Sequence, residues 1–326
     1  MKLGLISLLI GSIAAVTLGT VPPARADKVR IAHSTWVGFG PFYIARDKGF
    51  FKKRGVEVEL TIVESPQERF PAIYADGFDM IASTVDTTLL YLKKPGDLQY
   101  IVAVDDSNGG DGIVANKTIA SLADLKGKRV AFSAGSVWQF YLDVLLARAD
   151  MKESELTPVN MSAGDAGAAF VAGKVDAAVT WEPWLTKGKR VEHGHLLADS
   201  STTPGLITDV MVATKDFIAK RAKDAKAVVD AWNEAVAYQR ANPEEASQIM
   251  AKGVGGWLNA PKMFGETLAG IKFYGADENK AFFGTKAKPG PLFQTTRDAI
   301  EIWSGHKKLQ VKVKPEDLIN YDFVNG

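Results

Sequence analysis

The residues Gly173–Trp184 read GKVDAAVTWEPW and predict a turn, a buried strand and a second turn. The preceding run GDAGAAFVAGK (164–174) has the small and apolar residues of a helix that ends at a glycine. Val175–Thr180 is a compact apolar run, which is typical of a strand buried in an α/β sheet. The last four residues, WEPW, follow its carboxyl end, where ligands bind in open α/β sheets. We therefore expect two indoles and a carboxylate to contact a small ligand there, the alternative being a loop whose tryptophans only cap the core.

The same pattern occurs earlier in the chain, in Gly77–Thr88 (GFDMIASTVDTT). Here too a helical run, a glycine, a strand that begins at an aspartate and a later acid follow in this order. Asp79 corresponds to Asp176, and Asp86 falls near the position of Glu182. The repeat predicts two similar α/β lobes whose strand ends enclose a ligand between them.

The repeat continues upstream, since the segments from Val29 (VRIAHSTWVGFGPF) and from Arg129 (RVAFSAGSVWQF) both predict a strand, a turn with a tryptophan and a helix. The tryptophan of the first turn, Trp36, is expected at the cleft. In the second segment Ser136 precedes a helix start, where a hydroxyl and free N–H groups can meet a ligand. For Trp138 two positions remain open, lining the cleft or packing beneath it.

Length and composition fit two lobes and limit the classes of function. The 326 residues suffice for two cores, and a formal charge of +1 gives no indication of a nucleic-acid partner. Cysteine is absent, which excludes disulfides and cysteine metal sites.

The first 26 residues predict a cleavable signal peptide. Lys2 precedes a short apolar run, and Ala24-Arg25-Ala26 is a typical cleavage site. The alternative is a membrane anchor, for which the run is short. Cleavage would change the formal charge from +1 to −1, and no lipid-attachment cysteine follows. We expect a soluble, unlipidated protein in the periplasm.

Three motifs resemble other kinds of site but lack essential parts. Gly38 and Gly40 lack the third glycine of a dinucleotide site, so we expect a bend that brings Trp36 to the cleft. The acidic run 105–112 (DDSNGGDG) lacks the final acid of a calcium loop, and we expect a crossing between the lobes. Its acids are costly to bury unless a cationic ligand or solvent neutralises them. His193 and His195 lack a third metal ligand.

Two further positions are expected at the cleft. Asp86 and Thr87 begin a predicted helix, so Asp86 is a candidate for its N-cap, for a ligand contact, or for both. Asp209 lies inside the apolar strand Leu206–Thr214, where an acid needs a partner. The helices predicted after this strand carry no reactive group set, and we expect them to brace the first lobe.

With these features in place, the chain resembles the periplasmic solute-binding proteins of the nitrate, sulfonate and taurine class of ABC importers, which share a fold with pyrimidine-precursor binding proteins. Five stretches carry the resemblance: FYIARDKGFFKKRGVEVEL (42–60), YADGFDMIAS (74–83), IASLADLKGKRVAFSAGS (119–136), FVAGKVDAAVTWEPW (170–184) and VMVATKDF (210–217).

The resemblance implies an α/β fold of two lobes with the ligand cleft between them and two crossing strands, near Asp111–Asn116 and Asp209–Thr214. Lobe 1 would comprise residues 27–112 and 212–326, and lobe 2 residues 113–211. It also implies a monomer that closes on its solute and delivers it to a permease and an ATPase in the inner membrane. Mapping the family's contact positions and adding the nearby acids and indoles gives the expected ligand-binding set, with no catalytic residue, metal ligand or cofactor: Trp36, Asp86, Thr87, Asp106, Asp111, Ser136, Trp181, Glu182, Trp184 and Asp209.

Most of these residues are acidic or aromatic, whereas a sulfonate or nitrate site calls for basic residues. We therefore expect a nitrogen-rich cationic or amide-like solute, of the guanidine, amine or urea type. Taurine, an alkyl sulfonate or nitrate is the alternative, taurine because an acid could accept its ammonium. The competing classes are a pyrimidine-precursor enzyme, for which the chain offers no nucleophile set, and a periplasmic sensor.

Overall fold

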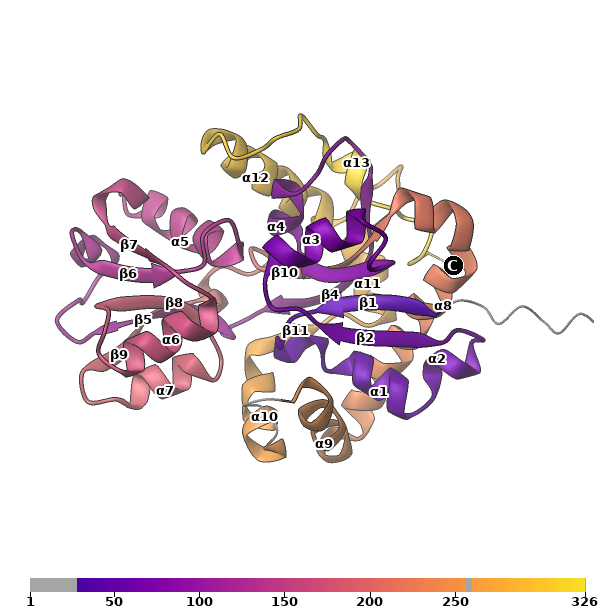
Figure 1. The fold of residues 1–326 in the computed structure, drawn as a ribbon, viewed down its shortest axis with the longest axis horizontal. Coiled ribbons are helices and arrows are strands. Elements are labelled where there is room, and N and C mark those ends of the chain that lie inside the picture. The colour runs from indigo at the N-terminus through magenta and orange to yellow at the C-terminus, as the bar shows by residue number, and fades with distance from the viewer. Residues whose placement is uncertain (1–27, 256–259, 326) are drawn as a thin grey trace, which may run out of the picture.

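The computed structural model describes residues 28–255 and 260–325, and it consists of two α/β lobes (Figure 1). Lobe 1 is built on a six-stranded mixed sheet in the order β11-β4-β10-β3-β1-β2. The first three strands along the chain are parallel, and β10 and β4 form the antiparallel pair beside them. The strands of this sheet are β1 (Val29–His33), β2 (Val58–Ile62), β3 (Met80–Thr84), β4 (Leu98–Ser107), β10 (Thr208–Thr214) and β11 (Ile271–Phe273).

Lobe 2 contains a five-stranded sheet in the order β7-β6-β8-β5-β9. Its strands are β5 (Asp111–Asn116), β6 (Arg129–Phe132), β7 (Thr157–Asn160), β8 (Ala177–Trp181) and β9 (Gly194–Asp199). Its helices are α5 (Val137–Arg148), α6 (Ala163–Val171) and α7 (Trp184–Arg190). The expected α/β architecture of two lobes is confirmed.

The internal repeat is visible as an identical backbone contact in the two lobes. In lobe 1, Asp79 just before β3 accepts the backbone N–H of Arg30 at 2.8 Å. In lobe 2, Asp176 before β8 accepts the backbone N–H of Arg129, also at 2.8 Å. Each carboxylate thus satisfies a donor at the beginning of the neighbouring parallel strand. The two aspartates that the repeat pairs therefore hold equivalent positions.

Two connections join the lobes, and they lie beside the segments that we expected. The chain leaves lobe 1 at Ser107, the end of β4, turns through Gly109, whose φ is 105°, and begins β5 at Asp111. It returns between the end of β9 and the start of β10. The segments 111–116 and 209–214, expected to cross between the lobes, are instead strands of one sheet each. The first pairs with β8 and β9 in lobe 2, and the second pairs with β3 and β4 in lobe 1.

Helices cover both faces of the lobe 1 sheet, and most of them come from the second half of the chain (Figure 1). The long α8 packs against α1, β4 and β10, so the late helices complete lobe 1 as expected. The early helices are α1 (Pro41–Asp47), α2 (Phe50–Lys53), α3 (Pro66–Tyr74) and α4 (Val85–Leu90). The late helices are α8 (Lys215–Ala241), α9 (Pro243–Val254), α10 (Pro261–Thr267), α11 (Ala276–Phe283), α12 (Pro291–Gly305) and α13 (Pro315–Leu318).

The predicted signal peptide lies outside the described residues. Within residues 28–255 and 260–325, no helix combines the length and the apolar character that crossing a bilayer requires.

Candidate ligand site

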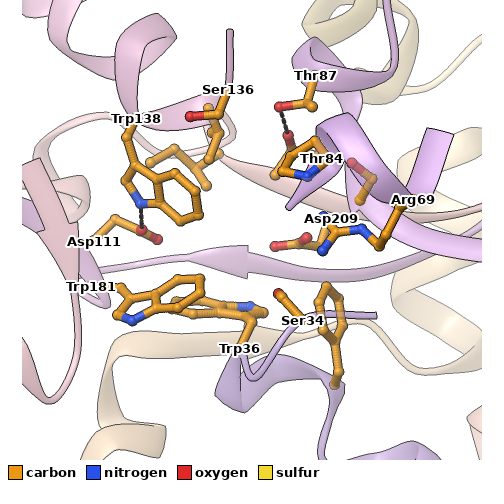
Figure 2. A pocket seen from close by; sticks show the side chains of 15 residues that line it. Ser34, Trp36, Arg69, Thr84, Thr87, Asp111, Ser136, Trp138, Trp181 and Asp209 are labelled. Atoms are coloured by element: carbon orange, nitrogen blue, oxygen red, sulfur yellow. Dashed lines mark hydrogen bonds between the residues drawn. The ribbon is translucent and has the colours of Figure 1, made fainter. Parts of the chain in front are cut away.

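A cavity lies between the two lobes, at the carboxyl ends of β1, β3 and β8 (Figure 2). Its free volume is about 30 Å³, so the lobes as they stand enclose little empty space. Both lobes contribute to its wall, so any movement of one lobe against the other changes its size. Its lining consists of Ser34, Trp36, Phe39, Pro66, Arg69, Ser83, Thr84, Thr87, Asp111, Ser136, Val137, Trp138, Trp181, Ile207 and Asp209.

Three tryptophans form the aromatic part of the wall. Trp36 of lobe 1 stacks on Trp181 of lobe 2 with 5.9 Å between ring centroids, and Trp138 meets Trp181 edge-on at 4.9 Å. Two of the indoles are fixed by carboxylates: Trp36 Nε1 donates to Asp105 at 3.1 Å and Trp138 Nε1 donates to Asp111 at 2.9 Å. This settles the position of Trp138, which lines the cavity.

Two carboxylates face the cavity, Asp111 from lobe 2 and Asp209 from lobe 1. Burial raises the pKa of Asp111 to about 6. Burial, together with the negative charges of Asp105 and Asp111, raises the pKa of Asp209 well above its usual range. Asp105 is the cross-strand neighbour of Asp209, so two buried acids lie opposite one another. No hydrogen bond to the Asp209 carboxylate is found among the described residues, and the positive charge of Arg69 partly opposes the rise of its pKa.

Arg69, which sequence analysis missed, brings a cation to the same cavity. The side chain is buried, and its Nη1 donates to the backbone carbonyls of Val63 at 2.6 Å and Glu64 at 3.1 Å. Nε has no hydrogen-bond partner, and among the residues that the structure describes no carboxylate lies within ion-pairing distance. Burial lowers the pKa of Arg69 to about 10, so the guanidinium stays charged at neutral pH. Figure 2 shows it pointing toward Asp209.

A signal for Arg69 was present in the sequence. The buried face of α3 comprises Pro66, Arg69, Phe70 and Ile73, which is the spacing of one apolar helix face. Burying an arginine in such a position is costly unless another group compensates for its charge. Periodicity alone cannot show whether that group is another residue of the protein or a ligand.

Two helix starts and their hydroxyl residues complete the wall. Ser136 is the N-cap residue of α5, and its hydroxyl donates to the Ser133 carbonyl at 2.6 Å instead of capping the helix. The first N–H groups of α5, which like those of any helix have no partner within it, are therefore not capped by the Ser136 side chain either. On the other lobe, Thr84 precedes α4, and its hydroxyl donates to Thr87 Oγ1 at 2.8 Å (Figure 2).

The structure brings six of the ten expected ligand-binding residues to this cavity: Trp36, Thr87, Asp111, Ser136, Trp181 and Asp209. The other four, Asp86, Asp106, Glu182 and Trp184, do not line it. Glu182 turns back to accept both the N–H and the hydroxyl of Thr186, at 3.0 and 2.8 Å. Asp106 accepts the N–H of Gly205 at 3.0 Å. Trp184 packs against Gly167 beneath α6, with Lys187 Nζ 4.3 Å from its ring centroid.

Asp86 occupies a buried position behind the cavity wall. The expected N-cap of α4 is wrong, because Thr84 holds that position and Asp86 lies in the first turn. One carboxylate oxygen has no partner, and the other accepts a long hydrogen bond of 3.3 Å from Thr87. Burial accordingly raises the pKa of Asp86 to about 7.

The buried carboxyl of Asp86 predicts that the free energy of unfolding depends on pH. A raised pKa means that the folded protein binds the proton more tightly than the unfolded chain, so stability is lost as the pH rises from about 4 to about 7. We expect Asp86→Asn to leave the unfolding free energy unchanged at pH 4 and to raise it at pH 8 by on the order of 2 kcal/mol. Urea unfolding of the ligand-free protein measures this, and equal stability at pH 8 would contradict it.

The weaker motifs have structural roles. Gly38 packs so closely that a Cβ atom there would lie 2.0 Å from the Asp105 carboxylate. The ring nitrogens Nε2 of His193 and His195 are paired with the backbone carbonyls of Phe170 and Ile119. In the part of the chain that the structure covers, no group of acids and histidines could hold a metal ion.

The model of a protein family described as NMT1/THI5 like matches residues 36–246, well over half of the chain. The chain belongs to this family. The expected resemblance to the solute-binding proteins of nitrate, sulfonate and taurine importers is therefore confirmed.

Two named relatives of this NMT1/THI5-like protein are solute-binding proteins. It is 27% identical over 258 residues to a putative aliphatic sulfonates-binding protein of Escherichia coli, covering 78% of this chain and 79% of that one. It is 26% identical over 228 residues to the taurine-binding periplasmic protein of the same organism, covering 68% and 69%.

Solved structures share the fold. The alkanesulfonate-binding protein SsuA of Xanthomonas axonopodis pv. citri, bound to MOPS, matches with a TM-score of 0.69 at 18% identity, over 89% of this chain and 99% of that one. The desulfurization enzyme DszB also matches, with a TM-score of 0.62 at 17% identity, over 91% and 98%. The fold alone therefore does not separate binding proteins from enzymes.

Proposed function

We propose that this NMT1/THI5-like protein is the solute-binding component of an ABC importer and that its solute is a small zwitterion with a sulfonate at one end and an ammonium at the other, as in taurine. One observation carries the proposal. The cavity presents a buried guanidinium and a buried carboxylate, Arg69 and Asp209, which attract one another but form no direct ion pair among the described residues. A zwitterion would give each of them a partner of opposite charge in direct contact.

Arg69 is the proposed anchor of the sulfonate. A guanidinium presents several N–H donors in a planar fork that suits the oxygens of an oxoanion. The free N–H groups at the start of α5 face the same cavity from lobe 2, and the helix N-terminus favours negative charge. A sulfonate held from both sides would stabilise the closed arrangement of the lobes.

Asp209 and Asp111 are the proposed acceptors for the ammonium. They come from different lobes, and both are nearly inaccessible to solvent. An ammonium between them would relieve the repulsion of two buried carboxylates and would favour their ionised forms. The three indoles would enclose the short carbon chain and exclude water, which strengthens each charged contact.

This proposal replaces the expected guanidine, amine or urea. The expectation counted five acids and no basic group, whereas only two of those acids line the cavity and Arg69 joins them. The sulfonate and taurine names of the relatives agree with the alternative that the sequence left open. We further propose periplasmic capture followed by delivery to a permease and an ATPase. An enzymatic role has less support, because the cavity holds no serine–histidine or cysteine nucleophile.

Calorimetry on protein freed of carried-over ligand by unfolding and refolding tests the proposal. We expect micromolar or tighter binding of taurine, and binding at least about tenfold weaker for isethionate, which replaces the ammonium by a hydroxyl, and for ethylamine, which lacks the sulfonate. Guanidine, urea, nitrate and a pyrimidine precursor complete the panel. Tight binding of guanidine or urea without taurine would restore the first expectation and contradict this one.

A further inference from the structure

A second hollow lies between the lobes and borders the cavity. The free volume of this outer cleft is about 590 Å³. Trp184, one of the expected ligand residues, lies here and not in the inner cavity. The lining residues of the outer cleft are Thr35, Glu64, Ser65, Pro66, Gln67, Ser133, Trp138, Asn160, Met161, Ser162, Ala163, Gly164, Asp165, Ala168, Trp181 and Trp184.

Only three side chains, Pro66, Trp138 and Trp181, line both hollows and so form the partition between them. Trp181 is its centre, since it contacts Trp138 edge-on at 4.9 Å and stacks on Trp36 at 5.9 Å. Pro66 belongs to lobe 1 and the two partition indoles to lobe 2, so the partition is complete only when the lobes are together. The inner cavity behind this partition has a free volume of only about 30 Å³.

We propose that Trp181 is a length filter: it confines the solute to the inner cavity and so excludes chains that would have to extend into the outer cleft. The inference rests on the proposed function for the nature of the two charged ends. A solute whose ends reach Arg69 and Asp209 and whose chain is short needs the lobes to part only slightly in order to stay behind the partition, where about 30 Å³ is free. A longer chain would have to displace the Trp181 ring from its two aromatic neighbours.

Trp181 can be removed more cleanly than the other two members of the partition. Its indole N–H is buried and has no hydrogen-bond acceptor among the described residues, so truncation leaves no carboxylate without its donor. Trp138, in contrast, donates to Asp111, and its loss would disturb an acid of the cavity. Pro66 begins α3, the helix that holds Arg69.

The test is calorimetry with ω-aminoalkanesulfonates of two, three, four and six carbons. We expect the affinity of the wild-type protein to fall at least about tenfold between the shortest and the longest chain. Trp181→Ala joins the two hollows and should bind the six-carbon compound at least about tenfold more tightly than the wild type does. Trp184→Ala removes an indole that packs against Gly167 and lines the outer cleft but not the inner cavity; it is the control and should keep the wild-type order.

Several outcomes would overturn the filter. If the wild-type protein bound all four chain lengths with equal affinity, the filter would be excluded without any variant. This measurement therefore decides the question even if Trp181→Ala does not fold. Trp181→Leu is a second, milder variant. A folded Trp181→Ala protein with the same dependence of affinity on chain length as the wild type would also exclude the filter. Parallel series of n-alkylamines and n-alkylguanidines keep the length dependence measurable if no sulfonate binds, an outcome that would contradict the proposed function and not the filter.

Discussion

Replacing Arg69 by Gln is expected to weaken taurine binding by at least about 100-fold. The guanidinium is buried and its Nε has no partner, so a sulfonate would form two or more charge-assisted hydrogen bonds with it, each contributing about 1.5–3 kcal/mol. Arg69→Lys keeps the charge without the planar fork, and we expect an intermediate loss. Calorimetry with taurine and isethionate measures both variants.

The matched control is Arg297→Gln, which removes an arginine from the exposed side of α12 and should leave both dissociation constants within about twofold. Thermal unfolding without ligand establishes that each variant is folded. A folded Arg69→Gln protein that binds taurine within threefold of the wild type would remove Arg69 from the site.

Replacing Asp209 by Asn is expected to change the affinities for two nearly identical ligands in opposite directions. Asn has the shape of Asp without its charge, so taurine loses a charge-assisted acceptor and should bind at least about tenfold more weakly. Isethionate has no ammonium, and the Asp209 carboxylate only repels its sulfonate. It should therefore bind more tightly to the variant. The ratio of the two dissociation constants, measured at pH 8, is the decisive quantity.

Glu182→Gln is the control for this experiment. The sequence alone predicts a loss of at least about tenfold for this substitution, because Glu182 follows the central strand of lobe 2. Since its carboxylate is held by Thr186 and does not line the cavity, we now expect changes within about twofold for both ligands. If Asp209→Asn weakened taurine and isethionate alike, its role as the ammonium acceptor would be excluded.

The sequence by itself determined the architecture. The repeated strand and turn pattern, with Asp79 and Asp176 at equivalent positions, predicts two related lobes. The aspartates make the same 2.8 Å contact to the neighbouring strand in both. Such patterns are local, because alternation, glycine positions and helix starts depend on residues close in the chain. For the same reason the residues after strands and at helix starts, such as Trp36, Ser136 and Trp181, could be placed at the cleft.

Only the tertiary structure decided which charges face the ligand. Glu182 lies at the expected strand end, but its direction is set by a partner four residues later in the next helix. Arg69 enters the cavity because α3 packs against β3, which places its arginine-bearing face beside Asp209 of the distant strand β10. The sign and number of charges in the cavity depend on side-chain direction and on long-range packing, and neither follows from sequence spacing. The fold could therefore be predicted from the sequence, whereas the nature of the solute could not.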